Sequence, residues 1–364
     1  MQLVHGRNRT SALGLALGLT LWIVLIALAM TEGLSRWIAS PLAVGMHVRL
    51  LVVIPLLFLC ESSVDPCVAS FVRTLARSGV VPEGALPNLS SKIVRIVRWR
   101  DSWIPEAVCV LLAVILWWYG TKLTRFGTAA DYMLDRPPVL SSLTGQWYWD
   151  VCLTVFRFLI LRWFWRLLLW WYFLGSLCRL PLRLVPVHPD GAGGIGYLEI
   201  VHAHFAPLVV AISVTQTASF VEGVRAGTMP NDAIYPAIAT VVLVDALLFL
   251  VPLAIFSPKL WACRMKGTEE YMRLAERYAT LFDEKWAGTE RVPDDKLLGA
   301  PDLNALVALK RVITEVGSVR WIPASPRLLS QLTIAAFLPM APLLLLKYPL
   351  ADLLQKFVER LSGL

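Results

Sequence analysis

The feature that most constrains this chain is a series of apolar stretches of membrane-spanning length. The first runs from Ser11 to Met30 without a charged side chain. About 20 apolar residues in a helix cross the roughly 30 Å hydrocarbon core of a bilayer. Composition points the same way, since 57% of the residues are hydrophobic and 16% are charged, whereas soluble domains average about 45–50% and about 25%. The sequence therefore predicts a polytopic membrane protein.

Seven stretches have this character, and we predict an all-α bundle of about seven transmembrane spans. The predicted spans cover residues 11–31, 41–60, 103–120, 151–174, 205–224, 236–257 and 328–347. The first is kept as a span because it exceeds the roughly 7–15 apolar residues of a signal peptide. The predicted parts are a transmembrane bundle at 1–257 containing a helical loop at 61–102, a helical segment at 258–327, and a last part at 328–364. That last part holds the seventh span and an amphipathic helix at 350–364.

Basic residues predict the orientation of these spans. Loop 61–102 carries six Lys or Arg and segment 258–327 carries twelve, and both lie on the side of the N-terminus. The positive-inside rule places that side in the cytoplasm and, with seven spans, the C-terminus outside. Loop 121–150, predicted outside, carries three Lys or Arg, and loop 175–204, predicted inside, carries two. This pair of loops runs against the rule. The net charge of +8 is explained by cytoplasmic loops, so no nucleic-acid partner is expected.

Apolar periodicity predicts short helices inside the two basic regions. The loop is expected to form helices at 64–78 and 90–100, separated by "VPEGALPN". The large segment is expected to form helices at 258–287 and 303–316. Amphipathic helices with basic faces often lie on an anionic membrane surface.

One polar stretch, "VPVHPDGAGGIGYLE" at 185–199, interrupts the apolar pattern. It fits G-x-G-x-x-G, but the surrounding βαβ unit that a dinucleotide site needs is missing. We interpret it as a turn or hinge formed by His188, Asp190, Gly191, Gly193, Gly194 and Gly196. A metal site is a weaker alternative, because Glu199 and His202 share one helix face. No second E-x-x-H pair accompanies them, so no cofactor is expected.

The same stretch carries a resemblance to a known family. "RWFWRLLLW", "LRLVPVHPDGAGGIGYLE", "LFDEKW", "LLGAPDLNAL" and "VRWIPASPR" resemble uncharacterised bacterial multi-span inner-membrane proteins that share H-P-D-x-A-G-G-[LI]-G-[FY]-L. The resemblance covers roughly the second half of the chain. It implies a multi-pass protein of the bacterial inner membrane and brings no activity with it. Glu199 and His202 depart from the family pattern, which weakens the metal alternative.

Charges inside the predicted spans are the strongest chemical signal. Arg49, Arg162 and Asp245 fall near span centres, where each costs about 2.5–3.5 kcal/mol on insertion scales. Arg157 and Arg166 are interpreted as snorkelling towards headgroups. Two interpretations stay open: Asp245 pairs with Arg49 or Arg162 to lock the bundle, or these groups line a hydrated pathway. The candidate pathway residues are Asp245, Arg162, Arg49, Ser213, Gln216 and Thr217.

Three classes of function follow from these features. The leading hypothesis is a channel or transporter for a small ion or solute, and the excess of arginine favours anions. The alternative is a non-transporting scaffold or signalling protein that recruits a cytoplasmic partner through 258–327. A membrane-bound metallo-enzyme is third, because no Ser-His-Asp, H-E-x-x-H or C-x-x-C set supports catalysis. The bilayer and further copies of the chain, in a homo-oligomer, are the expected partners.

Overall fold

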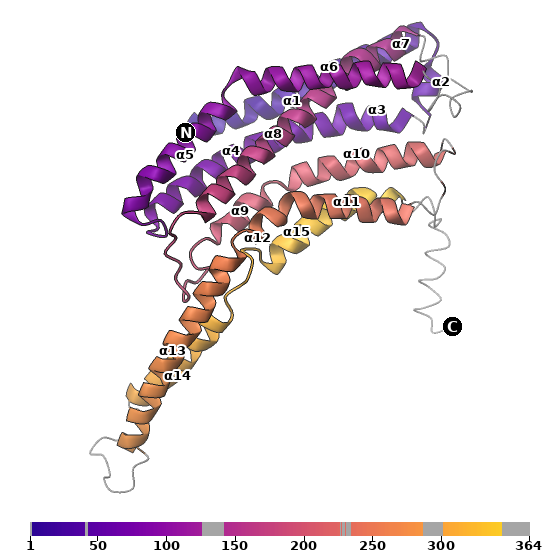
Figure 1. Ribbon diagram of the computed structural model, residues 1–364. Helices are drawn as coiled ribbons and strands as arrows, with labels where there is room; N and C mark the ends of the chain where they lie inside the picture. The colour runs from indigo at the N-terminus through magenta and orange to yellow at the C-terminus, as the bar shows by residue number, and fades with distance from the viewer. Residues whose placement is uncertain are drawn as a thin grey trace, which may run out of the picture.

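A computed structural model describes residues 2–40, 43–125, 142–225, 227, 230, 234–286 and 301–343. All regular structure in these ranges is helical, and no strand occurs in them. Long helices run side by side in a bundle, and one helical hairpin projects away from it (Figure 1). The predicted all-α fold class is therefore confirmed.

Three helical stretches are long and apolar enough to cross a membrane: Thr10–Thr31, Val44–Arg77 and Tyr197–Arg225. They belong to α1 (Gln2–Thr31), to the series α3 (Val44–Val48), η2 (Arg49–Val53) and α4 (Ile54–Arg77), and to α9 (Tyr197–Ala203) with α10 (Ala206–Arg225). A fourth candidate is a bent pair in which Glu83–Arg100 and Trp103–Tyr119 meet at 44°. This pair contains η3 (Glu83–Ala85), α5 (Leu86–Arg100) and α6 (Trp103–Arg125).

Other helices occupy the remaining predicted spans. They are α8 (Leu153–Cys178), α11 (Ile234–Phe249) and α15 (Pro326–Phe337), accompanied by the short elements α2 (Ser35–Ile38), α7 (Leu143–Gln146), η6 (Trp147–Cys152), α12 (Val251–Ala254) and η8 (Leu338–Met340). α8 carries three arginines. The 16 residues of α11 and the 12 of α15 are fewer than the roughly 17–25 of a typical span. The structure thus gives three to four candidate spans by length and composition.

The helix that contains α4 corrects one predicted boundary. The expected span at 41–60 and the expected separate helix at 64–78 form one continuous helix from Val44 to Arg77. Glu61 and Asp65, which lie where the two expected helices would have been separated, face arginines of α8. The expected helix at 90–100 is confirmed as part of α5. The expected helix at 350–364 lies outside the described residues.

Small residues let the first two candidate spans approach closely. A Cβ atom at Gly14 would lie 2.5 Å from Cβ of Phe58, and one at Gly18 would lie 2.3 Å from the carbonyl oxygen of Leu50. Without side chains there, α1 packs directly on η2 and α4, as small residues permit in membrane bundles. The core continues through an aromatic cluster in which Phe71 packs on Trp170 and Phe173.

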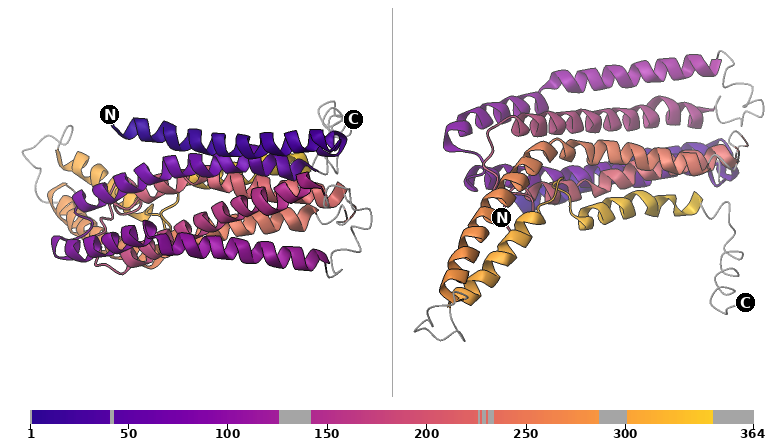
Figure 2. Two further views of the ribbon diagram at one scale, coloured as in Figure 1. Left: turned by 90° about the horizontal axis from the view of Figure 1, so that it is seen from above. Right: turned by 60° about the horizontal axis from the view of Figure 1, so that its bottom comes forward.

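The projecting hairpin consists of α13 (Ser257–Trp286) and α14 (Pro301–Gly317), which confirms two predicted helices. Near its tip, the Tyr278 hydroxyl donates to the Asp302 carbonyl at 2.9 Å, and Lys285 Nζ lies 2.8 Å from Asp302 Oδ2. The hairpin leaves the bundle at the end that also holds the N-terminus and α5 (Figures 1 and 2). We call this the basic end; α2 and α7 lie at the opposite end.

Candidate functional site

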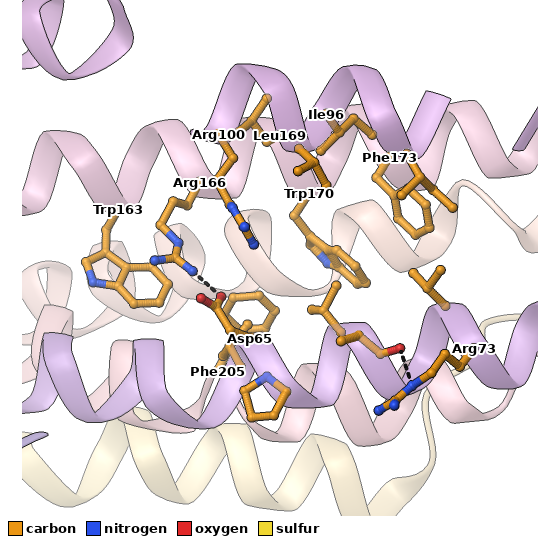
Figure 3. A pocket seen from close by; sticks show the side chains of 17 residues that line it. Asp65, Arg73, Ile96, Arg100, Trp163, Arg166, Leu169, Trp170, Phe173 and Phe205 are labelled. Atoms are coloured by element: carbon orange, nitrogen blue, oxygen red, sulfur yellow. Dashed lines mark hydrogen bonds and ion pairs between the residues drawn. The ribbon is translucent and has the colours of Figure 1, made fainter. Parts of the chain in front are cut away.

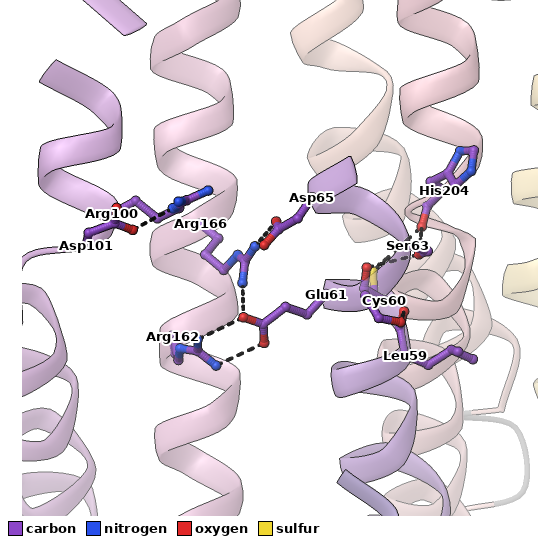
Figure 4. A network of polar contacts seen from close by, with 11 residues as sticks. Leu59, Cys60, Glu61, Ser63, Asp65, Arg100, Asp101, Arg162, Arg166 and His204 are labelled. Atoms are coloured by element: carbon purple, nitrogen blue, oxygen red, sulfur yellow. Dashed lines mark hydrogen bonds and ion pairs between the residues drawn. The ribbon is translucent and has the colours of Figure 1, made fainter. Parts of the chain in front are cut away.

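Two acids and two arginines form an ion-pair network between α4 and α8. Arg162 Nη1 and Nη2 donate to the two carboxylate oxygens of Glu61 at 3.1 and 2.9 Å. Arg166 Nη1 lies 2.6 Å from Glu61 Oε1, and Arg166 also donates to Asp65 (Figure 4). Two negative and two positive groups therefore meet at short distance and balance one another, while a third acid, the exposed Glu106, lies 3.9 Å from Arg162 Nε.

The spacing of the network fixes the relative direction of its helices. Glu61 and Asp65 are four residues apart on α4, and Arg162 and Arg166 are four residues apart on α8. Residues four apart lie on one helix face. Because the lower-numbered residues meet and the higher-numbered residues meet, α4 and α8 run in the same direction. Arg162, a predicted pathway residue, is thus a partner in a neutral inter-helix clamp.

Arg49 stands in a different setting, at the π-helical turn η2. Its Nη1 donates to the Tyr148 hydroxyl at 2.6 Å and its Nη2 donates to Ser219 Oγ at 3.1 Å. Glu222 Oε2 lies 3.7 Å from Nη2, while Glu222 Oε1 accepts the backbone N–H of Gly45 at 2.6 Å. Tyr148 belongs to a second π-helical turn, η6. Such turns are rare and often occur at functional sites.

Arg157 on α8 adds a second positive charge to this setting. It interacts electrostatically with Tyr148 and Arg49. Its Nη1 atom is buried and has no hydrogen-bond partner, and no carboxylate within the described ranges forms an ion pair with it. We call this group the arginine site; its members are Arg49, Arg157, Tyr148, Ser219 and Glu222. It contains two guanidinium groups and one carboxylate.

Asp245 on α11 forms a third polar grouping. It is 6% exposed, and its Oδ2 accepts a hydrogen bond from Ser213 Oγ at 3.1 Å. Its Oδ1 and Thr217 Oγ1 are buried without partners in the described structure, whereas Gln216 is exposed. The predicted pairing of Asp245 with Arg49 or Arg162 is wrong. Arg162 faces α4, and Arg49 faces Ser219 and Glu222 further along α10.

The H-P-D stretch forms the predicted turn, organised by one carboxylate. Asp190 accepts backbone N–H groups from Ala192 at 2.8 Å, Gly194 at 3.0 Å and Gly196 at 2.7 Å. Gly191, Gly193 and Gly194 have positive φ angles of 59°, 66° and 100°, which favour glycine. Burial raises the pKa of Asp190, but the three N–H groups and His188 outweigh it and leave the pKa below its ordinary value.

The turn is a docking point within the fold. Gly194 lies so close to Val80 that an added Cβ would be 2.8 Å from Val80 Cγ2. Arg320, in the segment after α14, donates to the Asp190 carbonyl and to Glu199 Oε2, the latter at 2.9 Å. Its own backbone N–H donates to the Gly191 carbonyl at 2.9 Å. The turn thereby joins the ends of α4 and α14, which is a more anchored role than the predicted hinge.

Glu199 and His202 are each in contact with other groups of the protein. Glu199 is occupied by Arg320 and by Ser325, whose backbone N–H donates to it at 3.2 Å. His202 is buried, with Nδ1 2.9 Å from the Leu198 carbonyl and Nε2 3.5 Å from the Trp170 indole nitrogen. No three His, Cys, Asp or Glu side chains in the described ranges are grouped to hold a metal ion. The weaker alternative of a metal site at Glu199 and His202 therefore finds no support in the described ranges.

Several residues of these sites were not predicted from sequence: Glu61, Asp65, Arg166, Arg157, Tyr148, Ser219 and Glu222. A usable signal existed for the network, because an acid pair and an arginine pair with the same four-residue spacing suit two adjacent helices. No comparable pattern marks the arginine site. Its members come from η2, η6, α8 and α10, and only the packing brings them together.

Comparison of the chain with known proteins finds no matching family model, no matching curated protein and no matching solved structure. The resemblance carried by the H-P-D motif therefore remains a prediction.

Proposed function

We propose that this protein transports a small anion across the bacterial inner membrane and that the arginine site binds the anion during passage. The observation that carries the proposal is Arg157, whose buried Nη1 has no acceptor in the described structure. A buried guanidinium donor without an acceptor is costly in a low-dielectric setting. A small anion would satisfy it, and the balance of two arginines against one glutamate favours negative charge.

The surroundings of Arg157 support an anion rather than a cation. Tyr148 accepts a hydrogen bond from Arg49 and presents its hydroxyl group at the same site, whereas the Ser219 hydroxyl donates to the Thr215 carbonyl at 3.0 Å. Hydroxyl dipoles and guanidinium groups stabilise an anion that has lost part of its hydration shell. The α4–α8 network is electrically balanced, so in this account Arg162 and Arg166 hold the bundle together rather than bind substrate.

The proposal includes a seven-span topology with the N-terminus and the α13–α14 hairpin in the cytoplasm. Its support is that α1, α4, α6, α8, α10, α11 and α15 run alongside one another (Figures 1 and 2). α5 and the α13–α14 hairpin, at the basic end (Figure 1), belong to the two regions richest in Lys and Arg, 61–102 and 258–327, in keeping with the positive-inside rule. The homo-oligomer stays a prediction.

The test is anion flux in liposomes containing the purified full-length protein. Chloride efflux is expected to exceed potassium efflux, and Arg157→Gln should lower chloride efflux about tenfold or more, since a charged contact of about 1.5–3 kcal/mol is lost. Arg179→Gln is the matched control, because Arg179 lies exposed at the end of the same helix. Equal chloride efflux in Arg157→Gln and wild type, at equal incorporation, would contradict the proposal.

A scaffold is the second candidate, and the projecting hairpin favours it. Exposed apolar side chains lie along α13 and α14, among them Met265 at 53%, Leu281 at 59% and Val307 at 66% exposure. Exposed apolar surface of this kind is typical of an interaction site. Loss of a specific cytoplasmic partner in Leu281→Glu and Val307→Glu, together with no anion flux in wild type, would favour the scaffold.

A further inference from the structure

A pocket of about 490 Å³ lies at the basic end, between α4, α5 and α8 (Figure 3). Phe205, just after α9, also lines it. Its volume is within the roughly 300–1,000 Å³ of typical small-molecule sites. None of the residues assigned above to the arginine site lines it, so it is a separate feature of the bundle.

The walls of the pocket are apolar and aromatic. Trp170 stacks on Phe173 with ring centroids 5.5 Å apart and packs against Phe205 at 6.3 Å. Valine, isoleucine and leucine side chains of α4, α5 and α8 line the rest, including Val68, Ile96 and Leu169. Such a surface suits a hydrocarbon chain and offers a soluble polar ligand few hydrogen-bonding groups.

The charged groups at the pocket are mostly positive. Arg73, Arg100 and Arg166 line it, against one acid, Asp65. Asp65 is already bonded to Arg166, and Arg100 Nε lies 2.8 Å from Asp101 Oδ1, an exposed carboxylate outside the pocket lining. Arg73 Nε donates to the Ala69 carbonyl at 3.2 Å, and no carboxylate in the described ranges pairs with it. Beside its apolar walls the pocket therefore carries Arg73, which pairs with no carboxylate in the described ranges, and Arg100, whose ion pair is exposed to solvent.

The position of the pocket along α4 places this charge at a membrane border. A helix rises about 1.5 Å per residue, so the 20 residues from Val44 to Val64 span about 30 Å, the thickness of the hydrocarbon core. The pocket residues Val64 to Arg73 follow directly. α5, which forms another wall, is bent by 44° from the apolar helix α6. Headgroups are found at that depth, and anionic lipids attract arginine there.

We propose that this pocket binds an anionic phospholipid of the adjacent leaflet, with an acyl chain along the aromatic wall and the phosphate near Arg73 and Arg100. The proposal does not depend on anion transport. It rests on three features found together: a hydrocarbon-compatible cavity, two arginines of which one has no carboxylate partner in the described ranges and the other an exposed one, and a location at the headgroup level. Arg166 stays with Glu61 and Asp65, so the network need not open for the lipid to bind.

The test measures binding of phosphatidylglycerol and phosphatidylcholine with identical brominated acyl chains to the full-length protein in a neutral detergent. Brominated chains quench tryptophan fluorescence on contact, and Trp163 and Trp170 line the pocket. Wild type should bind phosphatidylglycerol about tenfold more tightly, as two arginines near a membrane surface allow. Arg73→Gln with Arg100→Gln should reduce this preference to about twofold or less.

The matched control is Arg77→Gln with Arg98→Gln, which removes the same charge from α4 and α5 outside the pocket lining. This control should keep the preference for phosphatidylglycerol. Val68→Phe, which narrows the cavity, should weaken both lipids together. Three results would overturn the proposal: equal binding of the two lipids by wild type, equal loss in both double variants, or displacement of phosphatidylglycerol by equimolar inorganic phosphate.

Discussion

The four arginines of the bundle interior lie in two regions that differ in charge balance. Arg162 and Arg166 meet Glu61 and Asp65 in matched pairs, with N–O distances of 2.6–3.1 Å to Glu61. Arg49 lies 3.7 Å from the carboxylate of Glu222, whereas no carboxylate in the described ranges pairs with Arg157. α8 contributes to both regions, since it carries Arg157 as well as Arg162 and Arg166.

The difference indicates which charges hold the fold and which are available to a ligand. A balanced network in a bundle satisfies its own members and leaves no net charge for a solute. A site with more arginines than carboxylates contains a cation without a counter-ion. Intramembrane charges of that kind commonly mark functional positions. The type of a charge and its depth in the bundle do not distinguish arginines that hold the fold from arginines available to a ligand. The number of carboxylates that contact each arginine does.

The largest expected effect on stability comes from removing Glu61, the acid at the centre of the balanced network. Glu61→Gln leaves Arg166 with Asp65 and leaves Arg162 with Glu106, which is 3.9 Å away and 57% exposed. Removing one partner of a fully buried pair costs about 3–5 kcal/mol, and since these side chains are 12–29% exposed, we expect a loss near the lower end of that range. The thermal unfolding midpoint of the purified protein in detergent should fall markedly.

Two further variants show whether the loss is specific to the ion-pair network. Glu106→Gln should shift the midpoint little, since exposed pairs contribute about 0–1 kcal/mol. Glu61→Gln with Arg162→Gln should recover part of the loss, because it removes charge from both sides. A midpoint for Glu61→Gln as high as that of Glu106→Gln would contradict the clamp role of the network.

At the arginine site, loss of the acid should strengthen anion binding as well as lower stability. Glu222→Gln removes a 3.7 Å ion pair but leaves Tyr148 and Ser219 on Arg49, so destabilisation should be about 1–3 kcal/mol. It also makes the site more positive. Stabilisation by added chloride should therefore increase relative to wild type, and a decrease would show that Glu222 is needed for the anion.

The sequence predicted the helical class and the approximate positions of most helices, because apolar length and period depend on local composition. It also identified Arg49, Arg162 and Asp245 as residues of interest. Their partners could not be predicted, since Arg49 meets Ser219 across 170 positions of sequence and Arg162 meets Glu61 across 101. The H-P-D turn was predictable because Asp190 bonds to residues within six positions.

Asp190 offers a third way to satisfy a charge, through backbone N–H groups, and its effect should be the smallest. Its folded pKa lies below the ordinary value of 3.8. Its contribution is therefore present above that value and is lost as pH falls through the lower folded pKa. Asp190→Asn should lower stability by about 1–3 kcal/mol at pH 7, and the gap to wild type should close in acid. A gap that is independent of pH would contradict this assignment.

The most direct test of the central claim is anion-dependent thermal stabilisation of wild type, Arg157→Gln and Arg162→Gln, in chloride against gluconate at equal ionic strength. A ligand that binds the folded state raises its stability by mass action. We expect Arg162→Gln to have a lower midpoint but to keep the chloride-induced rise, and Arg157→Gln to lose the rise. Loss of the rise in Arg162→Gln alone, with Arg157→Gln behaving as wild type, would contradict the account.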